Sequence, residues 1–346
     1  MQTWSSLNQG QQQALLSRPA MADNDALSNT VADIIQQVAK KGDEALRQLT
    51  ARFDGVELGE LALATGQLAC AVNEISNEVK AAIDTAYANI HAFHRAQKPS
   101  DVKVETAPGV VCELKHAPLD SVGLYIPGGS APLISTVLML GVTAQVAGCP
   151  RKVLCTPPNK QGNVPAEIRY AASLCDIDEV YLVGGAQAIA ALALGTDTIV
   201  KVDKIFGPGN SFVTEAKQQV SRIPAGPAID MPAGPSEVLV IADGKANPVF
   251  VASDLLSQAE HGADSQAILV SDSQALIQAT EQEVERQLMT LSRQDTARKA
   301  MSHSRYILTE SLDSAIEVSN QYAPEHLIIQ VEEARACLPK LRNAGS

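Results

Sequence analysis

The side chains best suited to chemistry lie in two short segments of the chain. Glu325 and His326 place a carboxylate beside an imidazole, and general acid–base catalysis uses groups of this kind. Gln258 and His261 are three residues apart in a predicted helix, so both side chains lie on one face. An amide oxygen and an imidazole can begin a zinc site, which three or four protein ligands complete. Taken alone, segments of this kind are more often polar loops or helix ends that face water, so neither decides the function.

Three glycine-rich turns, each directly after a predicted strand, could bind phosphate groups. They are Tyr125–Ser130, Gly184–Gln187 and Gly207–Asn210, and the last two lead into predicted helices. Glycine allows backbone N–H groups to approach a phosphate, and a helix N-terminus adds a partial positive charge. In open parallel sheets, ligands bind at the carboxyl ends of the strands, where these turns lie. Together they favour a dinucleotide site. None matches the Gly-x-Gly-x-x-Gly pattern, and tight turns without a ligand remain the alternative.

Two sets of short aliphatic strands, separated by helical segments, must position these groups. Their alternation predicts parallel sheets covered by helices on both faces. A proline-containing loop from Asp230 to Ser236 joins the two sets. The first set has predicted strands at 122–126, 152–155, 179–183 and 204–206, and the second has them at 237–241, 266–270, 305–308 and 326–329.

The predicted fold class is α/β, with two doubly wound, Rossmann-like parallel-sheet domains and a short N-terminal helical arm. We expect the arm to comprise residues 1–24. Residues 122–236 would form an inserted domain that carries the glycine-rich turns. Residues 25–121 and 237–346 would form a discontinuous α/β domain that carries Gln258, His261, Glu325 and His326.

Composition excludes several classes of function. With 346 residues the chain is long enough for two domains. Its net charge of −12 argues against a protein that binds the phosphate backbone of nucleic acids. The longest apolar stretch, residues 188–194, is far shorter than the ~20 residues of a membrane helix. The polar N-terminus shows no signal-peptide pattern, so we expect a cytoplasmic protein.

The cysteines offer a possible nucleophile, but no feature selects one of them. None forms a Cys-x-x-Cys pair, so we expect reduced and mostly buried thiols. A cysteine nucleophile for aldehyde chemistry is the alternative. The six residues are Cys70, Cys112, Cys149, Cys155, Cys175 and Cys337.

Six strings of residues, read together, resemble the histidinol dehydrogenase family. The resemblance runs from about Arg18 to the last residue, and the strings occur in the order that the family shows. So many long matches in one order are far more specific than any single turn. The strings are Gly123–Ser130, Val183–Ala190, Lys204–Asn210, Ile229–Glu237, Leu255–Gly262 and Tyr322–Leu327.

The resemblance implies a zinc-containing enzyme of histidine biosynthesis. Such an enzyme oxidises L-histidinol to L-histidinaldehyde and then to L-histidine, with two NAD molecules used in sequence. Zinc would anchor the substrate and hold its carbinol carbon near the nicotinamide, which is a positioning role. The resemblance also implies a homodimer for the full-length form.

Site residues follow from the resemblance, position by position. Gln258 and His261 would be zinc ligands, His326 would accept the alcohol proton, and Glu325 would activate the water that hydrates the aldehyde. The implied NAD contacts are Tyr125, Gln187 and Asn210, and the implied substrate contacts are Ser236, Gln258, His261 and His326.

One departure from the family pattern concerns the end of the chain. Family members continue beyond the position of Ser346 into a segment that supplies an Asp ligand, a Glu substrate contact and a His ligand. The present sequence holds two of the four expected zinc ligands. We therefore expect this chain to fold, to bind zinc weakly and to turn over little or no substrate. We also expect the stop at Ser346 to be an artificial boundary, because Gly345-Ser346 reads as the approach to another strand.

Three other functions remain open. A non-catalytic remnant that binds NAD or dimerises would bind NAD without responding to histidinol. A zinc hydrolase could use the same Gln, His and Glu groups, but it would have no use for the glycine-rich turns. A cysteine-dependent aldehyde dehydrogenase would be inactivated by alkylating agents.

Overall fold

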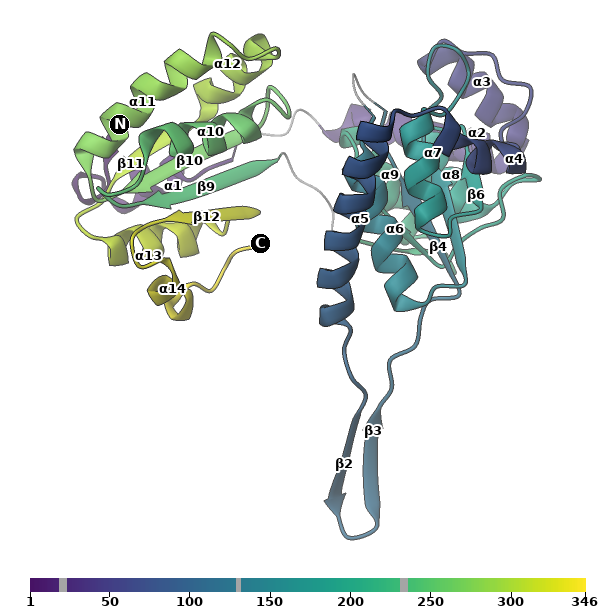
Figure 1. The fold of residues 1–346 in the computed structure, drawn as a ribbon, viewed down its shortest axis with the longest axis horizontal. Coiled ribbons are helices and arrows are strands. Elements are labelled where there is room, and N and C mark those ends of the chain that lie inside the picture. The colour runs from purple at the N-terminus through teal and green to yellow at the C-terminus, as the bar shows by residue number, and fades with distance from the viewer. Residues whose placement is uncertain (19–23, 129–131, 231–235) are drawn as a thin grey trace. The chain divides into compact units, whose positions relative to one another are not determined.

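The computed structural model describes residues 1–18, 24–128, 132–230 and 236–346 (Figure 1). The chain forms two compact units. Unit 1 comprises Met1–Ala22 and Gly234–Ser346, and unit 2 comprises Asp23–Ala233. The second boundary agrees with the expected division near Ser236. The grouping of the other segments differs from the expected one, as the packing of each unit shows.

The sheet of unit 2 has the strand order β6-β5-β4-β7-β8, and every neighbouring pair is parallel. Numbered along the chain, this order is 3-2-1-4-5, which is the doubly wound Rossmann order. The predicted first set of strands is confirmed, with bounds that shift by at most two residues, while β8 had not been predicted. The strands are β4 Ser121–Tyr125, β5 Arg151–Cys155, β6 Glu179–Tyr181, β7 Lys204–Phe206 and β8 Ala228–Ile229.

Helices cover both faces of this sheet. Alternate residues of β4 point to opposite faces, so Leu124 and Tyr125 belong to different hydrophobic clusters. One cluster packs α2 Asn24–Lys41, α3 Asp43–Phe53, α8 Gly185–Leu194 and α9 Ser211–Ser221 on the sheet. The other packs α4 Thr65–Cys70, α5 Asn77–Gln97, α6 Ile134–Ala147 and α7 Ala166–Leu174, with the short helix Ala71–Asn73.

Residues 25–121 therefore belong to unit 2, and not to the domain of residues 237–346 as expected from the sequence. The apolar stripe of α2, which includes Val31 and Val38, is buried against α8 and α9. Ile83 of α5 is buried against α6 and the sheet. These helices therefore belong to the unit whose sheet they cover.

A two-stranded antiparallel hairpin, which the sequence reading did not identify, extends from unit 2 (Figure 1). Its strands are β2 Val102–Ala107 and β3 Val110–Leu114, and all their residues are exposed. The register shifts between Glu105 and Ala107, which marks a bulge or irregularity near the turn.

Unit 1 holds a second parallel sheet, with the strand order β1-β11-β10-β9-β12. The expected separate arm is part of this unit. Its residues Gln2 and Thr3 pair with β11, and Trp4 and Leu15 lie in the core. The strands are β1 Gln2–Thr3, β9 Glu237–Ala242, β10 Gln266–Ser271, β11 Arg305–Leu308 and β12 His326–Gln330.

Helices also cover both faces of the unit 1 sheet (Figure 1). Val238 and Val240 face one layer of helices, and Leu239 and Ile241 face the other. The first layer is α10 Pro248–Ala259, α11 Gln274–Leu288 and α12 Gln294–His303. The second is α1 Gln9–Leu15, α13 Leu312–Tyr322 and α14 Ala334–Cys337, with short helices at Trp4–Ser6 and Leu338–Lys340.

Helix α10 begins with a well-formed cap. The Asn247 side chain accepts a hydrogen bond from the backbone N–H of Val249, and Pro248 is the first helical residue, where its missing N–H costs nothing. No helix in the described part of the chain is both long enough and apolar enough to cross a membrane.

Candidate active site

Two of the glycine-rich turns of unit 2 meet at its topological switch point. β4 and β7 are neighbours in the centre of the sheet, with Leu124 opposite Phe206, and the chain leaves them toward opposite sides. Gly207 follows β7 directly and has φ +132°. A Cβ on Gly207 would lie 2.1 Å from the carbonyl oxygen of Tyr125. The backbones thus approach so closely that only glycine fits, at the place where doubly wound sheets bind ligands.

An ion pair between buried Lys217 and partly exposed Asp230 fixes the start of the turn 207–210. The Lys217 ammonium donates to the Gly207 carbonyl oxygen over 2.9 Å and pairs with the Asp230 carboxylate. Asp230 Oδ2 in turn accepts from the Gly207 N–H over 2.8 Å. Both polar groups of the Gly207 backbone are therefore fixed by one ion pair, whose ammonium side chain is 4% exposed.

Asn210 begins the helix that follows this turn. Its side-chain oxygen accepts from the Val213 N–H over 3.1 Å and so caps α9. Because the cap uses the oxygen, the two amide protons of Asn210 remain for another acceptor. The predicted cofactor contact thus lies at a helix N-terminus, beside backbone N–H groups that favour an anion.

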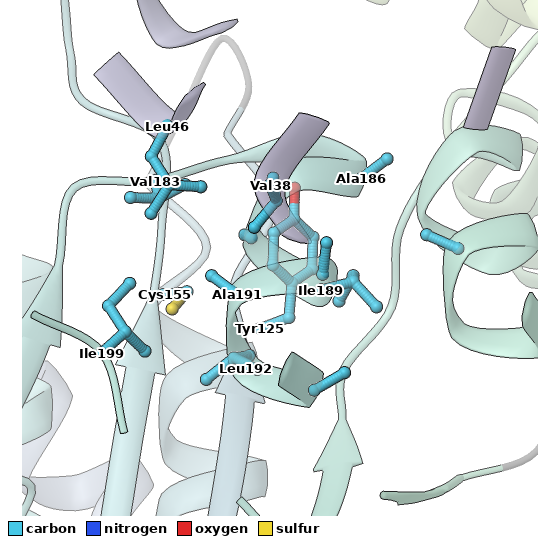
Figure 2. Packing of buried hydrophobic residues seen from close by; sticks show 14 of the residues in the cluster. Val38, Leu46, Tyr125, Cys155, Val183, Ala186, Ile189, Ala191, Leu192 and Ile199 are labelled. Carbon is cyan, nitrogen blue, oxygen red and sulfur yellow. The ribbon is translucent and has the colours of Figure 1, made fainter. Parts of the chain in front are cut away.

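Tyr125 connects the same turn to the one at 184–187. Its hydroxyl oxygen accepts from the Gly185 N–H over 2.9 Å, at the start of α8. Figure 2 shows the ring within a cluster of apolar side chains that includes Val38 and Ile189. Burial raises the pKa of Tyr125 to about 12, so the hydroxyl keeps its proton at neutral pH and can donate it to a ligand.

Pro157 packs against both the turn 125–130 and the turn 184–187. A Cβ on Gly128 would lie 2.5 Å from the Pro157 ring, and one on Gly184 would lie 2.6 Å from it. Gln187 is buried in the first turn of α8, and its side-chain oxygen lies 2.9 Å from where a Cβ of Gly185 would be. The structure therefore brings Tyr125, Gln187 and Asn210 to one edge of unit 2. Ser130, at the end of the first turn, lies outside the described residues.

The predicted residues of unit 1 lie at the amino ends of the strands of its sheet. His326 is the first residue of β12 and lies opposite Val238, near the start of β9. Ser236 precedes β9, and its carbonyl oxygen accepts from the N–H of Gln266, the first residue of β10, over 3.2 Å. These residues lie at the amino ends of the strands, whereas doubly wound sheets normally bind ligands at the carboxyl ends.

Helix α10 brings the other two predicted residues back to this edge. Because α10 connects the parallel strands β9 and β10, it runs antiparallel to them, and its last turn returns to their amino ends. Gln258 lies in that turn and is buried, while His261 follows it and is exposed. Glu325 and His326 are also exposed. Both residues of the predicted acid–base pair are therefore accessible to solvent.

The described residues supply few donors for a metal. Within 1–18, 24–128, 132–230 and 236–346, no group of three or more His, Cys, Asp or Glu residues could hold a metal ion. Gln258 and His261 offer one amide oxygen and one imidazole, and a catalytic zinc normally takes three protein ligands. Their assignment as zinc ligands stays a prediction.

The cysteines do not form a second candidate site. Cys155 and Cys175 are fully buried, and burial raises the pKa of Cys175 to about 12, so its reactive thiolate is suppressed. Cys70 and Cys112 are exposed. Among the described residues, no cysteine forms a hydrogen bond with Glu325 or His326.

Sequence reasoning missed Lys217 and Asp230 as groups that fix the turn 207–210. A signal was present: Lys217 shares the apolar stripe of α9 with Val213 and Val220, and a charge on such a stripe needs a buried partner. The partner is 13 residues further on in the sequence, so the pattern alone could not identify it.

Comparisons with known proteins agree on one family. A sequence model described as "Histidinol dehydrogenase" matches residues 17–346. The histidinol dehydrogenase of Colwellia psychrerythraea is 58% identical over 343 residues, which are 99% of this chain and 79% of that protein. That of Salmonella typhimurium is 54% identical over 343 residues, 99% of this chain and 78% of that protein. The crystal structure of histidinol dehydrogenase from Elizabethkingia anophelis superposes with a TM-score of 0.93 at 46% identity, covering 98% of this chain and 77% of that one.

Proposed function

Since the chain belongs to the histidinol dehydrogenase family, we propose that it oxidises L-histidinol through L-histidinaldehyde to L-histidine, with NAD as the oxidant in both steps. The observation that carries the cofactor assignment is the meeting of the glycine-rich turns at the switch point of unit 2. There, Gly207 has no room for a Cβ and lies beside Tyr125. A dinucleotide fits this edge because two helix N-termini and several backbone N–H groups lie there.

The residues of unit 2 would bind and orient the cofactor. Tyr125 donates its retained hydroxyl proton, and Asn210 donates from the amide group that the helix cap leaves free. Gln187, buried at the start of α8, supplies a further amide. NAD, when bound, accepts a hydride from the substrate carbon in each oxidation.

The residues of unit 1 would bind the substrate and move its protons. His326 takes the proton of the alcohol as the hydride leaves in the first oxidation. Glu325 takes a proton from the water that adds to the aldehyde carbon, which produces the hydrate that the second oxidation requires. Ser236, Gln258 and His261 lie at the same edge of the sheet and contact the substrate in this proposal.

Gln258 and His261 are the zinc ligands that this chain would supply. Two donors do not complete a zinc site, so no step of the reaction is assigned to the metal. The homodimer implied by the resemblance and the cytoplasmic location expected from the N-terminal sequence stay predictions.

A pair of matched substitutions tests the cofactor assignment. Asn210→Ser keeps a good helix cap but removes the amide donor, and Asn247→Ser makes the same exchange at the cap of α10. NADH formation with L-histidinol is measured for the unaltered chain and both variants, with and without added zinc. We expect Asn210→Ser to raise the KM for NAD about tenfold, which is the loss of one hydrogen bond. Asn247→Ser should leave it unchanged.

Two outcomes would contradict the proposal. If the unaltered chain binds NAD but forms no NADH with L-histidinol under any of these conditions, it is not a working histidinol dehydrogenase. If both Asn variants behave alike, Asn210 does not contact the cofactor.

A further inference from the structure

The carboxylate of Glu237 is buried and contacts the backbone of the proposed acid–base pair. Glu237, the first residue of β9, is 6% exposed. Its Oε1 accepts from the Glu325 backbone N–H over 3.1 Å and from Arg18 Nη2 over 2.7 Å. Its Oε2 accepts from Arg18 Nε over 2.8 Å and lies 2.8 Å from the Tyr322 hydroxyl. Charge-assisted hydrogen bonds with this two-pronged geometry are the strongest and most directional that proteins form.

The contact between Glu237 and Glu325 runs in both directions. While the Glu237 carboxylate accepts from the Glu325 N–H, the Glu237 N–H points at Glu325 Oε2 over 3.4 Å. β9 and β12 are neighbours in the sheet, so the two residues lie side by side at its amino edge. Glu237 therefore forms hydrogen bonds with both the backbone and the carboxylate of Glu325.

Arg18 holds the backbone that leads into this pair. Its Nη2 donates to the carbonyl oxygens of Tyr322 over 3.0 Å and of Ala323 over 3.1 Å. Ala323 ends α13 with φ 54° and ψ 66°, a left-handed conformation that costs a non-glycine residue about 1–2 kcal/mol. Such a conformation persists only where surrounding contacts enforce it. The guanidinium supplies those contacts, because it satisfies two carbonyl groups that the helix end leaves without partners.

The Tyr322 side chain closes the arrangement. Its ring lies under the Arg18 guanidinium at 4.5 Å, and its hydroxyl lies 2.8 Å from both Glu237 Oε2 and Gln266 Oε1. A hydroxyl carries one proton, which can serve only one of these acceptors at a time. We call the group of Arg18, Glu237 and Tyr322 the clamp.

We propose that Glu237 is a positioning residue for the oxidation: through the clamp it fixes where Glu325 and His326 stand, without touching substrate or cofactor itself. The proposal rests on the acid–base roles proposed above for Glu325 and His326. Every member lies in unit 1, and Arg18 comes from the N-terminal segment that joins this unit. In this proposal the N-terminal segment contributes to catalysis through Arg18, which lies 219 positions before Glu237 and 307 positions before Glu325.

Glu237→Gln tests the clamp with little change in shape. The substitution replaces one carboxylate oxygen with an NH2 group and removes the charge. The amide cannot accept from Arg18 Nε and Nη2 on two separate oxygens, and its neutral oxygen accepts more weakly from the Glu325 N–H. Arg18 is 45% exposed and can turn to water, so the variant should fold. Glu285→Gln is the matched control, because it breaks the exposed pair with Arg298 in the same unit.

Two measurements separate positioning from general stability. Hydrogen–deuterium exchange of the peptide that contains the Glu325 amide reports directly on its hydrogen bond to Glu237. Steady-state kinetics with L-histidinol and NAD separate kcat from KM. For Glu237→Gln we expect faster exchange at 322–327, a kcat lowered roughly 10- to 100-fold and an unchanged KM for NAD, since a misplacement of about 1 Å costs up to about 100-fold. Glu285→Gln should change none of these.

The outcomes distinguish this proposal from the proposed function. Unchanged exchange at 322–327 in Glu237→Gln would overturn the clamp itself. Faster exchange with a normal kcat would overturn the positioning role, because the acid–base pair would then work without it. If the unaltered chain does not oxidise L-histidinol, the proposed function fails, and a positioning role in that reaction is overturned with it. The exchange result would then show whether the contact to the Glu325 amide exists as a structural feature.

Discussion

Replacing Gly207 by alanine is the most direct perturbation of the proposed NAD site, because the new Cβ would collide with the backbone of β4. The new Cβ would lie 2.1 Å from the Tyr125 carbonyl oxygen, while ordinary contact begins at 3.4 Å. The overlap of roughly 1.3 Å falls on the backbone of β4, which is held between β5 and β7 and cannot withdraw. The turn must therefore move by about 1 Å, and a shift of this size in a binding group can cost about 100-fold in rate.

The conformation of Gly207 adds a second penalty. Its φ of +132° is a conformation that L side chains rarely adopt, and strain of this kind costs about 1–3 kcal/mol. Gly148→Ala is the matched control, because Gly148 has φ +89° at the end of α6 but nothing within 4 Å of its Cβ position. The control therefore carries backbone strain without the collision.

Calorimetric titration with NAD and urea unfolding separate the two penalties. We expect Gly207→Ala to weaken the Kd for NAD at least tenfold, about 1.4 kcal/mol, and to lower the free energy of unfolding by about 3 kcal/mol or more. Gly148→Ala should lose about 1 kcal/mol of unfolding free energy and bind NAD normally. If Gly207→Ala binds NAD as the unaltered chain does, the turn at the switch point does not hold the cofactor.

Three further predictions concern the ion pair, the buried tyrosine and the metal. Lys217→Met should leave Asp230 without its buried partner and loosen the turn, lowering the free energy of unfolding by about 3 kcal/mol and weakening NAD binding; unchanged values in urea unfolding and calorimetry would contradict this. Burial raises the pKa of Tyr125 from 10.0 to about 12, so its contribution to stability is fully present below pH 10 and is lost as the pH rises toward 12. In Tyr125→Phe, the free energy of unfolding should therefore fall by about 2–3 kcal/mol less between these pH values than in the unaltered chain. An equal fall in both proteins would refute the assignment. Because Gln258 and His261 are the only predicted zinc ligands of this chain, its zinc content after dialysis should fall well below one per chain, and a stoichiometric content by atomic absorption would contradict the two-donor account.

Most of the architecture could be predicted from the sequence because the strand and helix periods are strong. Strands of the second set, such as β11 at Arg305–Leu308, appear at the predicted residues, since apolar runs between polar turns identify a strand buried on both faces. Strand β7 at Lys204–Phe206 likewise appears at the predicted residues. These features depend on local sequence alone.

The assignment of segments to units could not be predicted in the same way. The stripe of α2 shows that one face is buried, but not which sheet covers it, because the periodicity of a helix says nothing about its partner. Trp4 and Leu15 were equally ambiguous, and the pairing of Gln2 with Ile307 depends on a strand 305 residues away. The hairpin at 102–114 was not predicted because all residues of its two strands are exposed. The sequence therefore contains no run of buried apolar residues there that would mark a strand.

The candidate site shows the same limit. The resemblance read from the sequence predicts roles for Tyr125, Asn210 and His326. The sequence could not show that Glu237 and Arg18 hold the backbone next to the proposed acid–base pair. Such contacts join residues far apart in the chain, and a single sequence carries no signal for them except a charge in an apolar context.

The most direct test of the central claim is the stoichiometry of NADH formed per L-histidinol consumed. The account predicts two NADH per L-histidine produced, because each of the two oxidations transfers one hydride to NAD. Formation of one NADH with release of the aldehyde would contradict the role of Glu325 in the second step. Consumption of NAD without L-histidine, or no NADH at all, would contradict the proposed function as a whole.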